Sequence, residues 1–215
     1  MFVCLHVLNP EFDFPDGNPN VDAKTHSKIT TGTYQNKFGI AFEEIYDLYF
    51  KTCRDEVKRA APHHLYCGSR FLRNVAPDVV ALASGYCDVI SFNIYEYNVT
   101  DRKVFGADKP FLVGEFHFGA LDRGVFGTGN RWAGDQQDRA GMYEDYMTSA
   151  LRNPACVGAH WFQYNAQSLT GRDDGENFQI GLVDIASNPH PEMRDALRRF
   201  GYGMYEACTA ASANP

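Results

Sequence analysis

The sequence KPFLVGEFHFG, residues 109–119, is a short apolar run that a proline opens and a glycine closes, with a carboxylate and an imidazole at its end. Side chains two positions apart share one face of a strand, so Glu115 and His117 should point the same way and Phe116 the other. Burying an unpaired carboxylate costs roughly several kcal/mol. Glu115 is therefore expected to have a chemical task, or else to lie just past the strand end and pair with an arginine.

Outward from this strand, helical and strand-like patterns alternate along the chain. The expected helices are 39–61, 77–86, 135–152 and 191–208, and the expected strands are 64–71, 87–95, 111–116 and 156–163. This alternation predicts an α/β fold with parallel strands. Polar loops at 119–134 and 165–177 follow strands, where such folds keep their sites. Residues 1–38 are expected to be an irregular N-terminal segment, 39–208 the ordered part and 209–215 a frayed tail.

Composition excludes several classes of protein. The 215 residues include 20 basic and 27 acidic side chains, a net charge of −7, and no basic run of the kind that binds nucleic acid. The N-terminus lacks the basic region of a signal peptide, and no apolar run is long enough for a membrane span. Aromatic residues make up 14%, which suits stacking on sugar rings as well as filling a core. Six cysteines without zinc-ligand spacing are expected to be mostly buried free thiols: Cys4, Cys53, Cys67, Cys87, Cys156 and Cys208.

Each expected strand ends in residues that can bind or react. In chain order these are Arg70, then Asn93 and Tyr95, then Glu115 and His117, and finally His160, Trp161 and Gln163. Carboxyl ends of parallel strands meet at one edge of a sheet. Four strand ends are therefore expected to converge on one chemistry.

Four motifs carry a resemblance to a known family. They are HLYCGSRF at 64–71, GEFHFGALD at 114–122, GAHWFQY at 158–164 and LTGRDDGEN at 169–177. A strand-end Glu with a Tyr one strand earlier and a Trp one strand later resembles the second half of a clan A glycoside hydrolase barrel. More narrowly, the motifs resemble the β-agarases of glycoside hydrolase family 50, over roughly residues 38–205.

The resemblance implies retaining hydrolysis of β-1,4 galactosidic links in agarose or agaro-oligosaccharides, with no cofactor and no metal. Glu115 matches the nucleophile, Tyr95 would orient it by donating a hydrogen bond, and Trp161 would stack under the sugar. Further candidates for recognising sugar hydroxyls are His117, His160, Gln163, Asn93, Arg70 and Glu176. A retaining mechanism also needs a second carboxyl group about 5 to 5.5 Å away.

One departure from the family concerns that second group. In the clan, the acid/base Glu follows an Asn at the end of the fourth barrel strand, and this sequence has no Asn-Glu dipeptide. Glu11, Glu43 and Glu44 do not stand in for it. A (β/α)8 TIM barrel usually takes about 250 residues. We therefore expect residues 39–208 to be the C-terminal half of a glycoside hydrolase barrel, about strands 5 to 8, with little activity alone.

The same expectation bears on partners and location. Open strand edges would call for the missing N-terminal half or self-association. The full-length protein is expected to be extracellular or periplasmic, because its polymeric substrate lies outside the cell.

Two other functions compete with this one. Glu115, His117 and His160 could form a metal site with two imidazoles and one carboxylate. Alternatively, the chain could be a non-catalytic remnant that binds agar or another galactan without cleaving it. Metal analysis would test the first, and affinity without turnover would favour the second.

Overall fold

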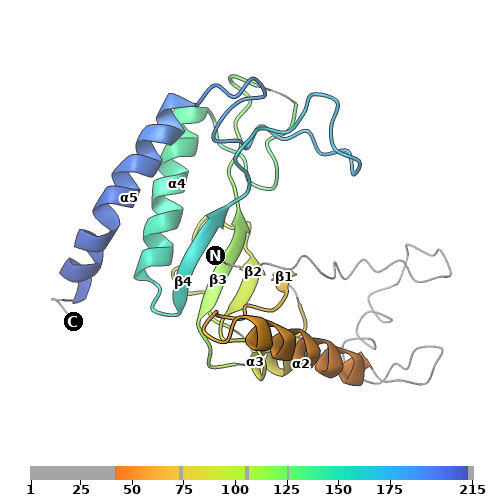
Figure 1. The fold of residues 1–215 in the computed structure, drawn as a ribbon. Coiled ribbons are helices and arrows are strands. Elements are labelled where there is room, and N and C mark those ends of the chain that lie inside the picture. Colours follow the sequence, from red (N-terminus) through yellow and green to blue (C-terminus); the bar gives the residue numbers. More distant parts are fainter. Residues whose placement is uncertain (1–41, 73–74, 105–106, 125, 213–215) are drawn as a thin grey trace. The chain divides into compact units, whose positions relative to one another are not determined.

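The computed structural model describes residues 42–72, 75–104, 107–124 and 126–212. The whole of the expected irregular segment 1–38 and the end of the tail therefore lie outside the described residues. The helices are α2 (Phe42–Ala60), α3 (Pro77–Ser84), α4 (Gln136–Arg152) and α5 (Pro191–Ser212), and the strands are β1 (Arg70–Leu72), β2 (Ile90–Asn93), β3 (Phe111–Phe116) and β4 (Cys156–Trp161). The strands form a sheet in the order β1-β2-β3-β4 (Figure 1). The predicted α/β fold with a parallel sheet is confirmed.

The expected β3 and α4 are found at or within one residue of their predicted bounds. Asp135 caps α4, because its side chain accepts the Asp138 N–H. The first strand is much shorter than the predicted 64–71. Gly68 lies in that stretch with φ +62°, and a Cβ there would come 2.4 Å from Cys87 Sγ. A left-handed residue in close contact interrupts extended pairing, so only Arg70–Leu72 pairs.

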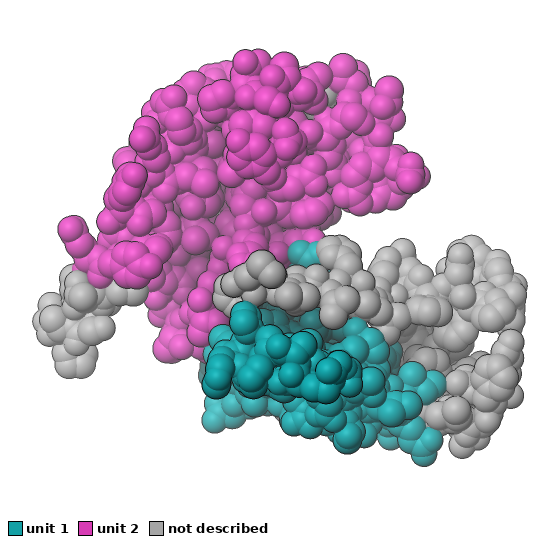
Figure 2. All heavy atoms as spheres, in the orientation of Figure 1, with its two compact units in different colours: residues 1–92, 103–112 teal, residues 93–102, 113–215 magenta. Residues whose placement is uncertain are grey.

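The chain consists of two compact units (Figure 2). Unit 1 comprises the described parts of 1–92 and 103–112, and contains α2 and α3. Its aromatic core runs from Phe50 through Phe71 to Phe92, with successive ring centroids 6.1 Å apart. Lys58 donates to Asp88 over 2.8 Å, and Asp88 also accepts the Tyr66 N–H. Packing and this ion pair therefore join α2 to the chain entering β2.

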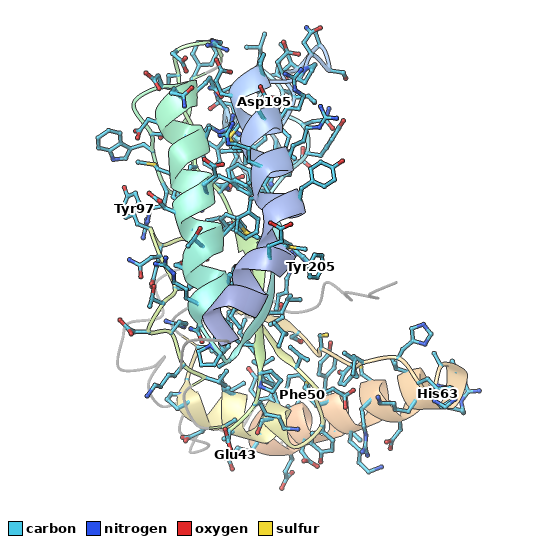
Figure 3. The ribbon with its side chains drawn as sticks, turned by 90° about the vertical axis from the view of Figure 1, so that its left-hand side faces the viewer. Glu43, Phe50, His63, Tyr97, Asp195 and Tyr205 are labelled. Atoms are coloured by element: carbon cyan, nitrogen blue, oxygen red, sulfur yellow. The ribbon has the colours of Figure 1, made fainter. Side chains whose placement is uncertain are left out.

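Unit 2 comprises residues 93–102 and the described part of 113–215. Helices α4 and α5 lie along one another, as both ribbon views show (Figures 1 and 3). Phe116 of β3 stacks flat on Tyr146 of α4, with centroids 4.1 Å apart. The Tyr146 hydroxyl donates to the Ile94 carbonyl over 2.9 Å. This aromatic layer fixes which face of β3 meets α4 and leaves Glu115 on the other.

Two further expectations can be checked on the described residues. Cys53, Cys67, Cys87 and Cys156 are free thiols, although only Cys87 is fully buried. Among the described helices, none is both long and apolar enough to cross a membrane.

Candidate active site

The candidate site is centred on the carboxylate of Glu115, which is 8% exposed near the end of β3. Its Oε2 accepts two hydrogen bonds of 2.7 Å, one from the Tyr95 hydroxyl and one from the Asn93 amide. Neutral donors of this kind stabilise an ionised carboxylate and fix its direction. The buried carboxylate therefore has two hydrogen-bond partners on the neighbouring strand and its continuation.

Strand register explains why these side chains meet. The Ile94 N–H bonds the Glu115 carbonyl over 2.9 Å, which sets Asn93, the last residue of β2, beside Glu115. Tyr95 lies two positions further along, on the same side of the chain. Because side chains alternate along β2 and its continuation, Asn93 and Tyr95 both face Glu115 Oε2.

His117 shares the Glu115 face but differs from its predicted role in recognising sugar hydroxyls. Its Nδ1 lies 3.1 Å from the Phe162 carbonyl oxygen, and its Nε2 accepts the Asn130 N–H over 2.8 Å. Burial lowers its pKa to about 4, the Phe162 hydrogen bond partly opposes this, and the charges of Arg139 and Arg131 add to the lowering. The imidazole is neutral at physiological pH, with both nitrogens bonded to main chain.

That arrangement also bears on the metal alternative. A ligating imidazole must offer one nitrogen to the ion, and both nitrogens of His117 already serve backbone groups. Within the described ranges, no group of three or more His, Cys, Asp and Glu side chains is arranged to hold an ion. The site formed by Glu115, His117 and His160 is therefore not what this structure favours.

The structure does not bring Trp161 to Glu115, which corrects the prediction of a sugar platform at this residue. The Phe162 N–H bonds the Phe116 carbonyl, so Trp161 lies beside Phe116, on the helix side of the sheet. Its indole packs edge-on against Phe116 and Tyr143 and donates to the Ile180 carbonyl over 2.9 Å. A one-residue step along β4 moves a side chain to the other face.

Phe162 is the aromatic residue of β4's end that does lie on the Glu115 side. Its ring centroid is 6.2 Å from that of His117, and the Arg172 guanidinium lies 6.0 Å from it. The sequence predicted neither Phe162 nor Arg172 as a site residue. The LTGRDDGEN motif could have indicated Arg172, whereas the face of Phe162 depends on the register between β3 and β4, which a single sequence does not fix.

Arg172 belongs to a charged cluster in the loop after β4. It bonds Asp174 and lies 3.2 Å from Glu176, which also accepts the Gln167 amide over 2.8 Å. The pKa of Arg172 is raised mainly by the Asp174 hydrogen bond, against a smaller effect of burial, and the charges of Glu176, Asp174 and Glu115 raise it further. The guanidinium is thus within electrostatic range of Glu115, and Glu176 holds that guanidinium.

The remaining predicted residues lie in different places. His160 is exposed and on the Glu115 face of β4, while Gln163 donates to the Asn165 carbonyl over 3.1 Å. Arg70 opens β1 in unit 1. Loops 119–134 and 162–178 both lie beyond the ends of β3 and β4 (Figure 1). The described site thus combines residues from β2, β3, β4 and the loop after β4.

The fold is α/β, and the site is centred on a buried carboxylate that accepts hydrogen bonds from two neutral donors. The chain is homologous to a segment of the β-agarases, as two relatives from Vibrio sp. (strain JT0107) show. It is 42% identical to β-agarase B over 163 residues, covering 73% of this chain and 17% of the relative. It is also 42% identical to β-agarase A over 176 residues, covering 77% of this chain and 18% of the relative.

Solved structures of agarases are also similar to this chain. An exo-β-agarase aligns with TM-score 0.73 at 42% identity, over 77% of this chain and 23% of its own. The agarase AgWH50C aligns with TM-score 0.69 at 40% identity, over 77% and 24%. No protein-family model matches the sequence. The predicted resemblance to family 50 agarases is confirmed, and the chain spans less than a fifth of the two curated relatives' length.

Proposed function

We propose that this chain carries the nucleophile side of a retaining glycoside hydrolase site that cleaves β-1,4 galactosidic links in agarose. The observation that carries the proposal is the Glu115 carboxylate with the Tyr95 hydroxyl and the Asn93 amide both 2.7 Å from Oε2. Homology to proteins named β-agarases supports the substrate.

The proposed reaction has two steps. Glu115 attacks the anomeric carbon, forming a C–O bond as the glycosidic C–O bond breaks, and the leaving oxygen takes a proton from an acid. Water then attacks the same carbon, gives its proton to the conjugate base and releases Glu115. The hydrogen bonds from Tyr95 and Asn93 hold the carboxylate of Glu115 in a fixed direction in the first step.

Substrate contacts are proposed from position. His160 lies on the Glu115 face of β4, and Gln163 and Glu176 follow it in the next loop. We keep these three, together with Arg70, as candidates for binding sugar hydroxyls. Phe162, with its ring on that face, takes the place predicted for Trp161.

The larger architecture also belongs to this proposal. Strand and helix alternation, together with the agarase alignments, supports a C-terminal half of a (β/α)8 barrel. The full-length protein would act outside the cytoplasm, either extracellularly on agarose or in the periplasm on agaro-oligosaccharides. Its remaining barrel strands would supply the acid/base.

The test is covalent trapping with a fluorinated β-galactoside that carries a dinitrophenolate leaving group. Such a leaving group needs no proton, so attack by the nucleophile can be observed without the acid/base. The intact mass should rise by one fluorogalactosyl group, and peptide mapping should place the group on Glu115.

Glu115→Gln should abolish labelling, while Glu144→Gln should not, because Glu144 is an α4 residue that pairs with Arg199. Labelling at another residue would overturn the assignment. Affinity for agarose without any labelling of the folded chain would favour the non-catalytic binding function instead.

A further inference from the structure

The two hydrogen bonds of His117 determine its tautomer. A backbone N–H can only donate and a carbonyl can only accept, so Nε2 carries no proton and Nδ1 carries one. The ring is 1% exposed. Its hydrogen-bonding capacity in the neutral form is used entirely by the main chain of Asn130 and Phe162.

The ring also lies against the Glu115 partners. Its centroid is 4.6 Å from that of Tyr95, whose hydroxyl donates to Glu115. On its other side the backbone approaches closely, since a Cβ on Gly129 would lie 2.4 Å from His117 Nε2. One imidazole therefore contacts the chain after β2, the loop after β3 and the end of β4.

We propose that His117 is a positioning residue, a neutral imidazole that holds the Gly129-Asn130 segment and the Phe162 carbonyl in place and supports the ring of Tyr95 beside Glu115. Its effect on chemistry rests on the proposed function, whereas its effect on the loop does not. This role replaces direct recognition of sugar by His117.

The surroundings of the ring agree with a neutral role. The positive charges of Arg139 on α4 and of Arg131 in the loop after β3 both act on the imidazole and disfavour its charged form. The rings of Tyr95, Phe162 and Phe178 also lie around the imidazole. Protonation of Nε2 would turn an acceptor into a donor facing the Asn130 N–H, and that hydrogen bond would be lost.

The experiment uses three variants of the full chain. His117→Gln can place an amide acceptor near the Nε2 position, His117→Asn can place a donor near Nδ1, and His117→Phe keeps only a ring. Amide exchange at Asn130 should quicken about tenfold or more in His117→Asn and His117→Phe, and much less in His117→Gln. Trapping by the activated galactoside should slow clearly in His117→Asn and His117→Phe, and much less in His117→Gln.

A pH series separates positioning from general loss of structure. Asn130 protection in the wild type should collapse as the pH falls through about 4, while protection in His117→Gln should not, because an amide does not titrate there. Equal collapse in both proteins would overturn the proposal.

Gly129 supplies a second, independent test with a matched control. Gly129 and Gly175 both have positive φ, +72° and +86°, but a Cβ on Gly175 meets nothing within 4 Å. Both alanine variants carry backbone strain, and only Gly129→Ala should reproduce the His117→Phe exchange at Asn130.

The outcomes are distinguishable. Unchanged exchange at Asn130 in His117→Phe and in Gly129→Ala would refute the positioning role. Faster exchange, in a chain whose wild type takes no label, would support the positioning role and count against the proposed function.

Discussion

At the scale of single residues, one carboxylate oxygen of Glu115 accepts hydrogen bonds from both Tyr95 and Asn93. Tyr95→Phe removes one of them without changing the ring that packs on His117. Because hydrogen bonds to charged groups are worth about 1.5–3 kcal/mol, trapping should slow by about ten- to a hundredfold. The control is Tyr97→Phe, whose ring stacks on Phe118 instead, and it should react at the wild-type rate. Equal slowing in both variants would contradict the role of the Tyr95 hydroxyl.

His117 also predicts how stability depends on pH. Its pKa is about 4 in the folded chain and about 6.5 when unfolded, so between these values the unfolded chain binds a proton that the folded chain does not. Stability should therefore fall by up to about 3 kcal/mol as the pH drops from 6.5 to 4. Urea unfolding followed by tryptophan fluorescence would measure this, with a shallower dependence in His117→Gln. An identical slope in the two proteins would contradict the prediction.

Only some contacts of the site can be predicted from the sequence. The resemblance to clan A glycoside hydrolases predicts that Tyr95 donates a hydrogen bond to Glu115, and the structure shows that hydrogen bond. The position of Trp161 could not be read, because the face it occupies depends on register against Phe116, which a single sequence does not fix. The hydrogen bonds of both His117 nitrogens could not be predicted either, because Asn130 lies in an irregular loop whose path the sequence does not determine.

At the scale of elements, α4 is joined to two loops by a buried Arg139. Its guanidinium donates to the carbonyls of Phe118, Ile180 and Gly181, and to Gln136 Oε1. Burial lowers its pKa to about 9, which leaves it charged at neutral pH. Helix patterning predicted α4 well, but it could not show that a basic residue of this amphipathic helix faces inward.

Arg139→Met should destabilise unit 2 by about 3 kcal/mol or more, because several buried carbonyls lose their donors at once. Arg199→Met is the control, since Arg199 pairs with Glu144 on the surface and should change stability little. Urea midpoints read by tryptophan fluorescence would compare them, because both tryptophans, Trp132 and Trp161, lie in unit 2. Similar losses in the two variants would contradict this account.

At the scale of the whole molecule, the sequence holds a nucleophile candidate but no Asn-Glu dipeptide. We therefore predict two unequal activities for the chain. Release of reducing ends from agarose should be slow or undetectable, because a sugar leaving group needs protonation. Trapping by the activated galactoside should still proceed. Rapid release of reducing ends would show that a second carboxyl group in this chain serves as the acid/base.

The Arg139 hydrogen bonds bear on how this protein could be altered by protein engineering. Because one guanidinium fixes the main chain at Phe118 and at Ile180–Gly181, insertions or deletions next to those carbonyls would displace both loops together. Phe126 and Leu169 lie in the same two loops, away from these anchor points, with side chains 74% and 50% exposed. A library that diversifies these two positions and keeps the anchored carbonyls unchanged should yield mostly folded variants.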